Sequence, residues 1–539
     1  MSEAASTTIK LPEDPAALQA LVDENLATIA ELTFENATLR EELALLRHKR
    51  FGASSEKANA DQLQLFNEAE ETAAATSEAP DGTPETACEI TVPEHTRKTP
   101  GRKPLPPLLP RVRIEHDVPD AEKICPCGCM LSRIGEETSE QLDIAPAKIQ
   151  VLQHVRFKYA CRSCEGSSHD GAAVTIAPVP EQPIPKSNAS SGLLAHIVTS
   201  KFVDGLPLYR QTTMFARIGV DLGRGTMANW MIRTGELVIP LINLMGEVQL
   251  SHDLLQMDET TVQVLKEEGR TAEAKSRMWV RRGGPPDKPV ILFDYDPSRS
   301  GAVALRLLED YKGFLQTDGY SAYDGVSALL GLTHVACLAH ARRKFDEALK
   351  VQSKAGRGGL AAAGLALIQK IYRIEKVARE MGLTSDQRHQ LRNEKARPVW
   401  DELRRWLDSV RGHAPPSTLT GKALAYLDGQ WPRLIRVLED GRLEVDNNLC
   451  ENAIRPFVMG RKAWLFSATP AGAEASARLY GLIETAKANG LEPFAYLRHV
   501  FAELPKAKTL ADIEALLPWA IAKPATRLAG GERRDSVAA

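Results

Sequence analysis

Hydrophobic residues repeat every seven positions in the first fifty residues of the chain. They share two heptad positions with a few asparagines, the first held by Leu18, Asn25, Leu32, Leu39 and Leu46 and the second by Val22, Ile29, Asn36 and Leu43. This repeat predicts a coiled-coil dimerisation helix in residues 1–52, in which the two asparagines can fix the register and the number of strands. We therefore expect a homodimer or a higher oligomer. An amphipathic helix that packs on the protein's own core is the alternative.

The heptad pattern stops before the next segment, residues 53–110. Most of this segment is rich in Ala, Glu, Thr and Pro and poor in large apolar residues. Such a composition cannot bury enough surface to order a chain, so we interpret the segment as a disordered linker. Its basic end, residues 97–104, could contact phosphates or simply be solvated.

Helical spacing of apolar residues returns in residues 186–245. Three short helices are expected, the second over Leu208 to Ile218 and the third from about Thr226, with Gly219 at the turn between them. Such a pair of helices predicts a helix-turn-helix whose last helix enters the major groove of DNA. Short helices joined by glycine turns are also ordinary packing in unrelated domains, and the pattern alone does not separate the two interpretations.

Short apolar strands replace the helical pattern after Ser251. The strand segments are LLQMDETTVQVL, SRMWVRR, PVILFDYDP, GFLQTDGYSAY and the start of THVACLAHARRKF. Strands that are followed by helices predict a mixed sheet with helices packed against it. We therefore expect a multidomain α/β protein with this sheet in residues 246–500 and a C-terminal helix and tail in residues 501–539.

Length and charge narrow the class of protein. A chain of 539 residues exceeds what one hydrophobic core usually serves. It contains neither a run of about eighteen apolar residues nor the pattern of a signal peptide, so we expect a cytoplasmic protein that does not bind a membrane. Lys and Arg total 67 against 70 Asp and Glu. Any charge that binds nucleic acid must therefore be local.

Five of the eight cysteines crowd into one short stretch of the chain. They are Cys125, Cys127, Cys129, Cys161 and Cys164. Two cysteine clusters about thirty residues apart suit tetrahedral Zn²⁺, so we predict a structural zinc-binding unit in residues 111–185. Which of the first three sulfurs bind zinc stays open, and reduced thiols in a small β unit are the alternative.

Two aspartates interrupt the apolar strands, and a glutamate lies in a later helix. Asp258 lies in the first strand, Asp318 ends the fourth, and Glu451 follows Asp446, which we expect to be the N-cap of the helix. A carboxylate in a core strand is costly unless it is paired, hydrogen-bonded or bound to a metal. The three acids have the oxygen ligands that would hold two Mg²⁺ or Mn²⁺ ions in an RNase H-like catalytic site. The basic residues that could then hold the DNA backbone are Arg455, Arg461 and Lys462.

Other acids compete for these roles on spacing alone. Asp294, Asp296 and Asp324 also lie in or near strands, and Asp446 competes with Glu451. Isolated acids in strands are often paired in salt bridges, so the pattern leaves the choice among these carboxylates open.

Motifs along nearly the whole chain resemble one family of bacterial enzymes. They are the leucine heptads followed by KRFGASSEK, then RKPLPPLLPR, CPCGCMLSRIGEE, QMDET, LQTDGYSAYDGV, CLAHARRKF, VDNNLCENAIRP, GRKAWLFSATPAGAEASARLYGLIETAKANG and ALLPW. In these segments the chain closely resembles the large transposase of the bacterial insertion sequence 66 family.

The resemblance implies a DDE-type catalytic domain of RNase H-like fold with Asp258, Asp318 and Glu451 as its acids. It also implies the zinc unit, the helix-turn-helix and a helical insertion in residues 347–440. The expected activity is metal-dependent cleavage at the ends of an insertion sequence, followed by strand transfer. Its expected partners are the terminal inverted repeats, target DNA and small accessory transposition proteins.

Two further functions and one motif stay open. A catalytically inactive DNA-binding regulator derived from a transposase is the main alternative, and a nuclease that never joins DNA is another. Cys337 and His340 form a Cys-x-x-His pattern that looks like one seen in several transposase families. We favour the interpretation that they brace the helix beside the site over the interpretation that they bind metal.

Overall fold

The structure is a computed structural model that describes residues 14–51, 149–155, 158–160, 174–176, 180–351 and 359–521. The chain divides into two units, Met1–Gln64 with Pro180–Ala539 and Leu65–Val179, and each is described by itself. The predicted linker and all five predicted zinc ligands lie outside the described residues. In the Leu65–Val179 unit, β1 (Lys158–Ala160) pairs with β2 (Val174–Ile176) in antiparallel fashion.

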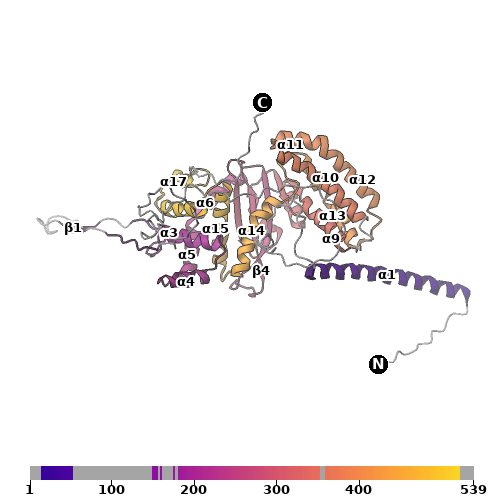
Figure 1. The fold of residues 1–539 in the computed structure, drawn as a ribbon, viewed down its shortest axis with the longest axis horizontal. Helices are drawn as coiled ribbons and strands as arrows, with labels where there is room; N and C mark the ends of the chain where they lie inside the picture. Colours follow the sequence, from indigo (N-terminus) through magenta and orange to yellow (C-terminus); the bar gives the residue numbers. More distant parts are fainter. Residues whose placement is uncertain are drawn as a thin grey trace, which may run out of the picture. The chain divides into compact units, whose positions relative to one another are not determined.

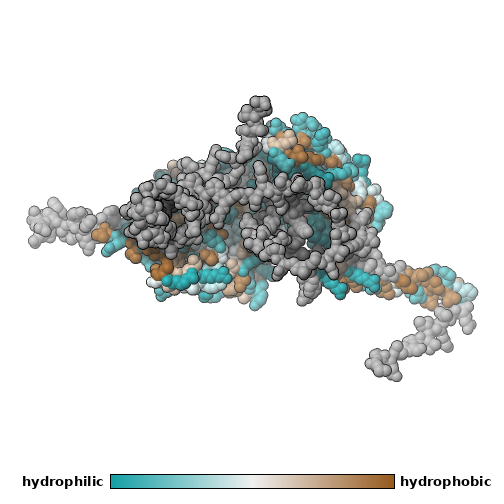
Figure 2. All heavy atoms as spheres, in the orientation of Figure 1, coloured by the Kyte–Doolittle hydropathy of each residue, from teal (hydrophilic) through white to brown (hydrophobic). Residues whose placement is uncertain are grey.

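Residues Pro15–Phe51 form one long helix, α1. The apolar residues of the heptad are exposed in the single chain, from 37 % at Leu18 to 64 % at Leu46. Figure 2 shows brown, hydrophobic residues on the surface of this helix. The seam asparagines each donate a side-chain hydrogen bond within the helix, Asn25 to Leu21 O and Asn36 to Leu32 O. The helix therefore presents an apolar seam to solvent.

Within residues 180–253, four helices lead into the sheet: α3 (Ser191–Phe202), α4 (Leu208–Arg217), α5 (Arg224–Leu237) and α6 (Ile239–Leu250). The Ser190 side chain caps α3 by accepting a hydrogen bond from Leu193 N. Gly219 follows α4 with φ of 82°, a backbone conformation that favours glycine. The buried faces of these helices join one hydrophobic core with α15 (Pro470–Ala488) and α16 (Pro493–Glu503).

A five-stranded mixed sheet follows, with helices packed against it (Figure 1). Its strands are β3 (Leu254–Gln263), β4 (Lys275–Gly283), β5 (Val290–Asp296), β6 (Phe314–Thr317) and β7 (Thr333–Ala336). The strand order is β5-β4-β3-β6-β7. The β3–β4 and β4–β5 pairs are antiparallel, whereas β3–β6 and β6–β7 are parallel. The predicted mixed α/β architecture is confirmed, and all five predicted strand segments contain a strand.

The two faces of the sheet have separate cores. Leu255 and Met257 of β3 pack with α7 (Gly301–Leu307) and α8 (Ser321–Leu330). Val280 of β4 lies in the core that contains α14 (Asn448–Trp464). Because side chains alternate along a strand, the even-numbered positions of β3 near Asp258 face α14. In Figure 1 α14 crosses the sheet.

A helical segment separates β7 from α14. Its helices are α9 (Leu338–Val351), α10 (Leu360–Glu380), α11 (Ser385–Leu391), α12 (Arg397–Val410) and α13 (Leu419–Leu434), with a π-helical turn at Arg392–Ala396. These helices share their own hydrophobic core around Phe345 and Trp400. The last helix of the described part is α17 (Leu510–Glu514), and the described residues end at 521. Among the described helices, none is long and apolar enough to cross a membrane.

Candidate active site

Asp258 and Asp318 lie at the same level of two neighbouring parallel strands. Gln256 of β3 is paired with Gln316 of β6, and their side chains form a hydrogen bond of 2.8 Å. Asp258 and Asp318 each follow two positions later, Asp318 just beyond the last residue of β6. Since residues two apart along a strand share a face, Asp258 belongs to the face that α14 covers. Asp318 lies in the turn at the end of β6, close enough to contribute, after burial and Glu259, to the raised pKa of Asp258.

The start of α14 places Glu451 beside the face of the sheet on which Asp258 lies. The buried Asn447 donates from its side-chain Nδ2 to Met257 O of β3 at 2.9 Å. Its backbone N–H donates to the Cys337 sulfur, which follows β7, at 3.1 Å. These two bonds fix the first turn of α14, which contains Glu451, beside Asp258. Asn447 was not singled out from the sequence, where the only signal was a polar residue directly before the helix.

The expected N-cap is displaced by one residue. Asn447, and not Asp446, is the N-cap of α14. Asp446 lies one position earlier and accepts hydrogen bonds from Asn448, through its backbone N at 3.1 Å and its side chain at 2.9 Å. Burial raises the pKa of Asp446. Because the Asn447 side chain bonds to β3, it makes no capping bond of its own, and the side chain that accepts a hydrogen bond from the start of the helix is that of Asp446.

The three acids influence one another electrostatically. The pKa of Asp258 is raised to about 8, first by burial, then by the neighbouring Glu259 carboxylate, and further by Glu451 and Asp318. The Glu259 backbone N–H donates to Asp258 Oδ1 at 2.8 Å, which offsets part of this rise. Within the described ranges, no lysine or arginine forms a salt bridge with Asp258. Asp258 itself therefore has no cationic partner in the described part of the chain, whereas Glu259 contacts Arg299 at 2.5 Å and Glu451 lies 3.9 Å from Arg343.

The competing aspartates are neutralised by cations. Asp294 lies 3.1 Å from the Arg281 guanidinium, and Asp296 lies 3.0 Å from that of Arg306. Asp324 lies 2.8 Å from Arg433 and 3.0 Å from His334. These three carboxylates are accounted for by structural ion pairs, so they do not need a metal to explain their place in the fold.

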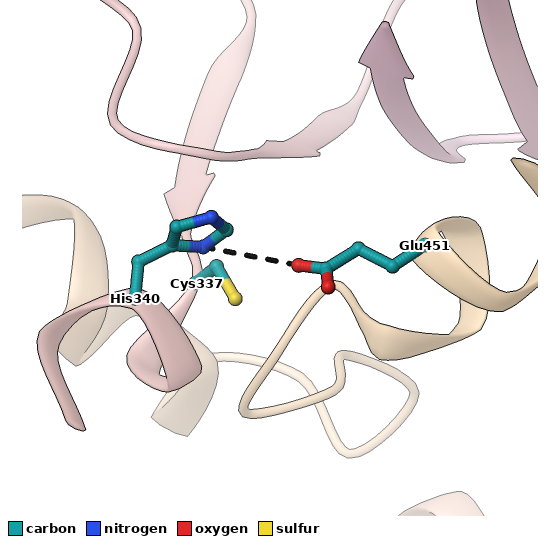
Figure 3. A group of neighbouring side chains, drawn as sticks. All are labelled: Cys337, His340 and Glu451. Carbon is teal, nitrogen blue, oxygen red and sulfur yellow. Dashed lines mark ion pairs between the residues drawn. The ribbon is translucent and has the colours of Figure 1, made fainter. Parts of the chain in front are cut away.

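Cys337 and His340 lie beside Glu451 (Figure 3). One ligand atom from each of the three residues lies within 4.8 Å of the others. His340 Nδ1 and Glu451 Oε1 are 3.9 Å apart, and neither buried atom has a hydrogen-bond partner among the described residues. Burial raises the pKa of the Cys337 thiol to about 12. The sulfur thus acts as a neutral acceptor that braces α14, whereas His340 and Glu451 direct a nitrogen and an oxygen at one shared space.

The basic residues of α14 lie in different environments. Arg461 donates from Nη1 to the Thr261 side chain at 2.8 Å and also to the Thr261 backbone oxygen, so it fastens the second half of α14 to β3. Burial lowers its pKa. Arg455 is half-buried, and Lys462 is exposed. Of the three residues proposed to contact DNA, Lys462 is the one whose side chain is open to solvent.

A second candidate surface lies on α5, away from the acids. Arg224, Thr226, Asn229 and Arg233 are exposed on this helix, whereas Trp230 is buried in the core. Arginine, asparagine and threonine are the side chains that contact base edges and phosphates in a major groove. This exposed face is the one that the predicted helix-turn-helix would present to DNA.

The acid cluster has the chemistry of a site for hard divalent cations. Its donors are carboxylate oxygens, the ligands that Mg²⁺ and Mn²⁺ prefer. Burial, together with repulsion from the neighbouring carboxylates, raises the pKa of Asp258, and Glu451 Oε1 is buried without a hydrogen-bond partner in the described part of the chain. A bound divalent cation would stabilise the ionised Asp258 and give Glu451 Oε1 a partner, so these residues fit a divalent cation.

Comparison with known proteins gives a consistent result along the chain. A family model described as "Transposase IS66 family" matches residues 186–475. Models described as "Transposase C of IS166 homeodomain", "zinc-finger binding domain of transposase IS66" and "IS66 C-terminal element" match residues 38–114, 122–165 and 481–519. The zinc-finger match spans all five predicted cysteine ligands and supports a structural zinc.

Two relatives from Sinorhizobium fredii (strain NBRC 101917 / NGR234) match most of the chain. Uncharacterized protein y4jD is 33 % identical over 427 residues, which cover 77 % of this chain and 81 % of the relative. Uncharacterized protein y4hP is 30 % identical over 493 residues, which cover 88 % of this chain and 87 % of the relative. Together with the family matches, these similarities show that the chain belongs to the IS66 family of transposases.

Proposed function

We propose that this protein is an active DNA transposase in which Asp258, Asp318 and Glu451 hold the catalytic divalent cations. What supports this is that Glu451, in the first turn of α14, and Asp318, just beyond β6, lie close enough to add to the rise that burial causes in the pKa of Asp258, which has no salt-bridge partner among the described residues. Acidic neighbours that serve structure form short salt bridges, whereas Asp258 forms none among the described residues and Glu451 has only a long contact, 3.9 Å, with the exposed Arg343. Bound Mg²⁺ or Mn²⁺ would supply activation of the attacking oxygen and stabilisation of the leaving oxygen.

The sheet supports an RNase H-like catalytic domain. Three antiparallel strands in chain order are followed by two strands added in parallel to the first, and Asp258 lies on that first, central strand. Asp318 lies beyond the carboxyl end of β6, the edge where α/β folds collect functional residues. This arrangement is the one that the family resemblance implies.

Different residues of the chain would have different roles in the reaction. Asp258, Asp318 and Glu451 supply the oxygen ligands, and Asn447 sets the position of α14. The exposed Lys462 would contact a backbone phosphate, with Arg455 a second candidate, whereas Arg461 holds the helix to β3. Water would first hydrolyse one phosphodiester at the element's end, leaving a 3′ hydroxyl. That hydroxyl would then attack a target phosphodiester, which releases a 3′ hydroxyl of the target strand, and no bond to the protein forms.

Recognition and assembly are assigned to the N-terminal parts. The α4–α5 pair and the zinc unit would bind the terminal inverted repeats, and target DNA would enter at the acid cluster. The exposed seam of α1 would pair with a second copy, since coiled-coil helices bury such a seam between chains.

A strand-transfer assay tests the proposal. Purified full-length protein would be incubated with labelled element ends, target plasmid and Mg²⁺ or Mn²⁺, and compared with Asp258→Ala and with Asp294→Ala as a control acid. We expect joined products that require metal and disappear in Asp258→Ala but not in Asp294→Ala. Joining that persists in Asp258→Ala would remove this residue from the mechanism. Binding of the ends without cleavage would instead support a DNA-binding regulator, and cleavage without joining would support a nuclease.

A further inference from the structure

Glu259, directly after Asp258, is a buried carboxylate whose two oxygens are both occupied. Its Oε1 accepts from Arg299 Nε at 2.6 Å, with Arg299 Nη2 at 2.5 Å, and its Oε2 accepts from the Tyr323 hydroxyl at 2.8 Å. The Glu259 side chain is only 2 % exposed. Both oxygens of Glu259 thus bind neighbouring side chains, and Glu259 anchors Arg299.

Arg299 extends from this anchor to the turn that follows β6. Its guanidinium lies over the ring of Tyr320, 3.9 Å from the ring centroid. The Tyr320 hydroxyl returns to the same residue and donates to Arg299 O at 3.0 Å. Arg299 and Tyr320 are therefore joined twice, once by a cation–π contact and once by a hydrogen bond.

Tyr320 also holds Asp318 directly. Its backbone N–H donates to Asp318 Oδ1 at 3.0 Å, which sets the direction of that carboxylate. Burial lowers the pKa of the Arg299 guanidinium, but Glu259 and, to a smaller extent, Asp318 raise it overall, so the Arg299 charge lies near Asp318. A continuous chain of contacts thus runs from Glu259 on β3, through Arg299 and Tyr320, to Asp318.

We propose that Arg299 and Tyr320 form a latch that positions the Asp318 carboxylate for cation binding. The inference rests on the proposed function and adds two residues to it. Asp258 is held by a ten-residue strand, whereas Asp318 lies in a turn after a strand of four residues. A ligand in a turn needs a support of this kind, because groups that orient metal ligands contribute strongly to metal affinity.

The test variant should disturb the latch without changing the charge beside the site. Removing Arg299 would also remove a positive charge, which by itself favours cation binding and would obscure the effect. Tyr320→Leu removes the ring and the hydroxyl and leaves the backbone N–H and every charge in place. Tyr320→Phe keeps the ring under Arg299 and loses only the hydroxyl. Arg306→Gln is the control, because Arg306 is 58 % exposed and pairs with Asp296 on the same segment of the chain.

Mn²⁺ binding to the full-length, zinc-loaded protein would be measured by electron paramagnetic resonance without DNA. Tyr320→Leu should weaken Mn²⁺ binding by about tenfold, the lower end of losses seen for residues that orient metal ligands. Tyr320→Phe should lie between Tyr320→Leu and wild type, and Arg306→Gln should match wild type. In strand transfer, the Tyr320→Leu defect should shrink as the Mn²⁺ concentration is raised.

The outcomes separate the latch from the proposed function. If wild type binds Mn²⁺ and Asp258→Ala does not, the metal site stands, and Tyr320→Leu binding equal to that of Arg306→Gln would refute the latch alone. If Tyr320→Leu lowers affinity for DNA in EDTA and leaves Mn²⁺ binding unchanged, Tyr320 is a DNA contact and the latch is also refuted. If wild type and Asp258→Ala bind Mn²⁺ alike, the proposed metal site and the latch both fail.

Discussion

Replacing Asp258 by asparagine should stabilise the metal-free protein, although it deletes a proposed catalytic group. The pKa of Asp258 is raised from 3.8 to about 8 by burial and by the neighbouring carboxylates. Each pKa unit corresponds to about 1.4 kcal/mol, so the ionised side chain costs the fold at most roughly 6 kcal/mol. Local rearrangement and entry of water reduce this cost, and we expect a measured gain of about 1–3 kcal/mol from the neutral asparagine.

The size of this stabilisation depends on pH. The folded pKa lies above the unfolded one, so the penalty is absent below about pH 4 and grows as the pH rises. It reaches its full size above about pH 8, where the carboxylate is ionised in both states. The advantage of Asp258→Asn should therefore be small at pH 5 and large at pH 8.5.

Thermal unfolding in EDTA measures this difference, with Asp294→Asn on β5, two strands along the sheet from β3, as a matched control. The Asp294 carboxylate neutralises Arg281, whose side chain is only 9 % exposed, so asparagine there should lower the melting temperature. Asp258→Asn should raise it by a few degrees at pH 8.5. Added Mn²⁺ should stabilise wild type and not Asp258→Asn. A lower melting temperature for Asp258→Asn in EDTA at pH 8.5, or a gain that does not change between pH 5 and 8.5, would refute the reasoning.

Three further substitutions test other parts of the structure. A Cβ at Gly319 would lie 2.5 Å from the Tyr426 hydroxyl, so Gly319→Ala should displace Tyr426 or the turn that follows Asp318 and reduce strand transfer. The double variant with Tyr426→Leu should restore part of the activity, and no restoration would exclude the clash as the cause. Asn447→Ala removes the buried hydrogen bond to Met257 O, so it should lower the free energy of unfolding by about 1–3 kcal/mol and slow joining. Unchanged stability and joining would contradict its role in placing α14. Leu32→Lys in the exposed seam of α1 should shift the protein from dimer towards monomer in sedimentation velocity, and an unchanged dimer would show that α1 does not hold the copies together.

The sequence alone was sufficient to predict the strands of the sheet, helices α4 and α5, and the family. Strand periodicity predicted the segments of β3 to β7, because alternating or continuous apolar runs report burial of a strand directly. Helical spacing likewise predicted α4 and α5 with the glycine turn between them. Dense motifs along the chain carried the resemblance, and the family matches confirm it.

Only the tertiary structure decided which acids form salt bridges and which residues hold them in place. Spacing could not separate Asp258 from Asp294, because salt-bridge partners such as Arg281 come from neighbouring strands. The hydrogen bond that ties the N-cap residue Asn447 to β3 reaches Met257, which is 190 residues away in the chain. No local sequence pattern could predict this bond. The contact between Arg299 and Tyr320 likewise joins two loops. Local patterns report burial along one segment, whereas charge compensation and ligand orientation depend on groups that only folding brings into contact.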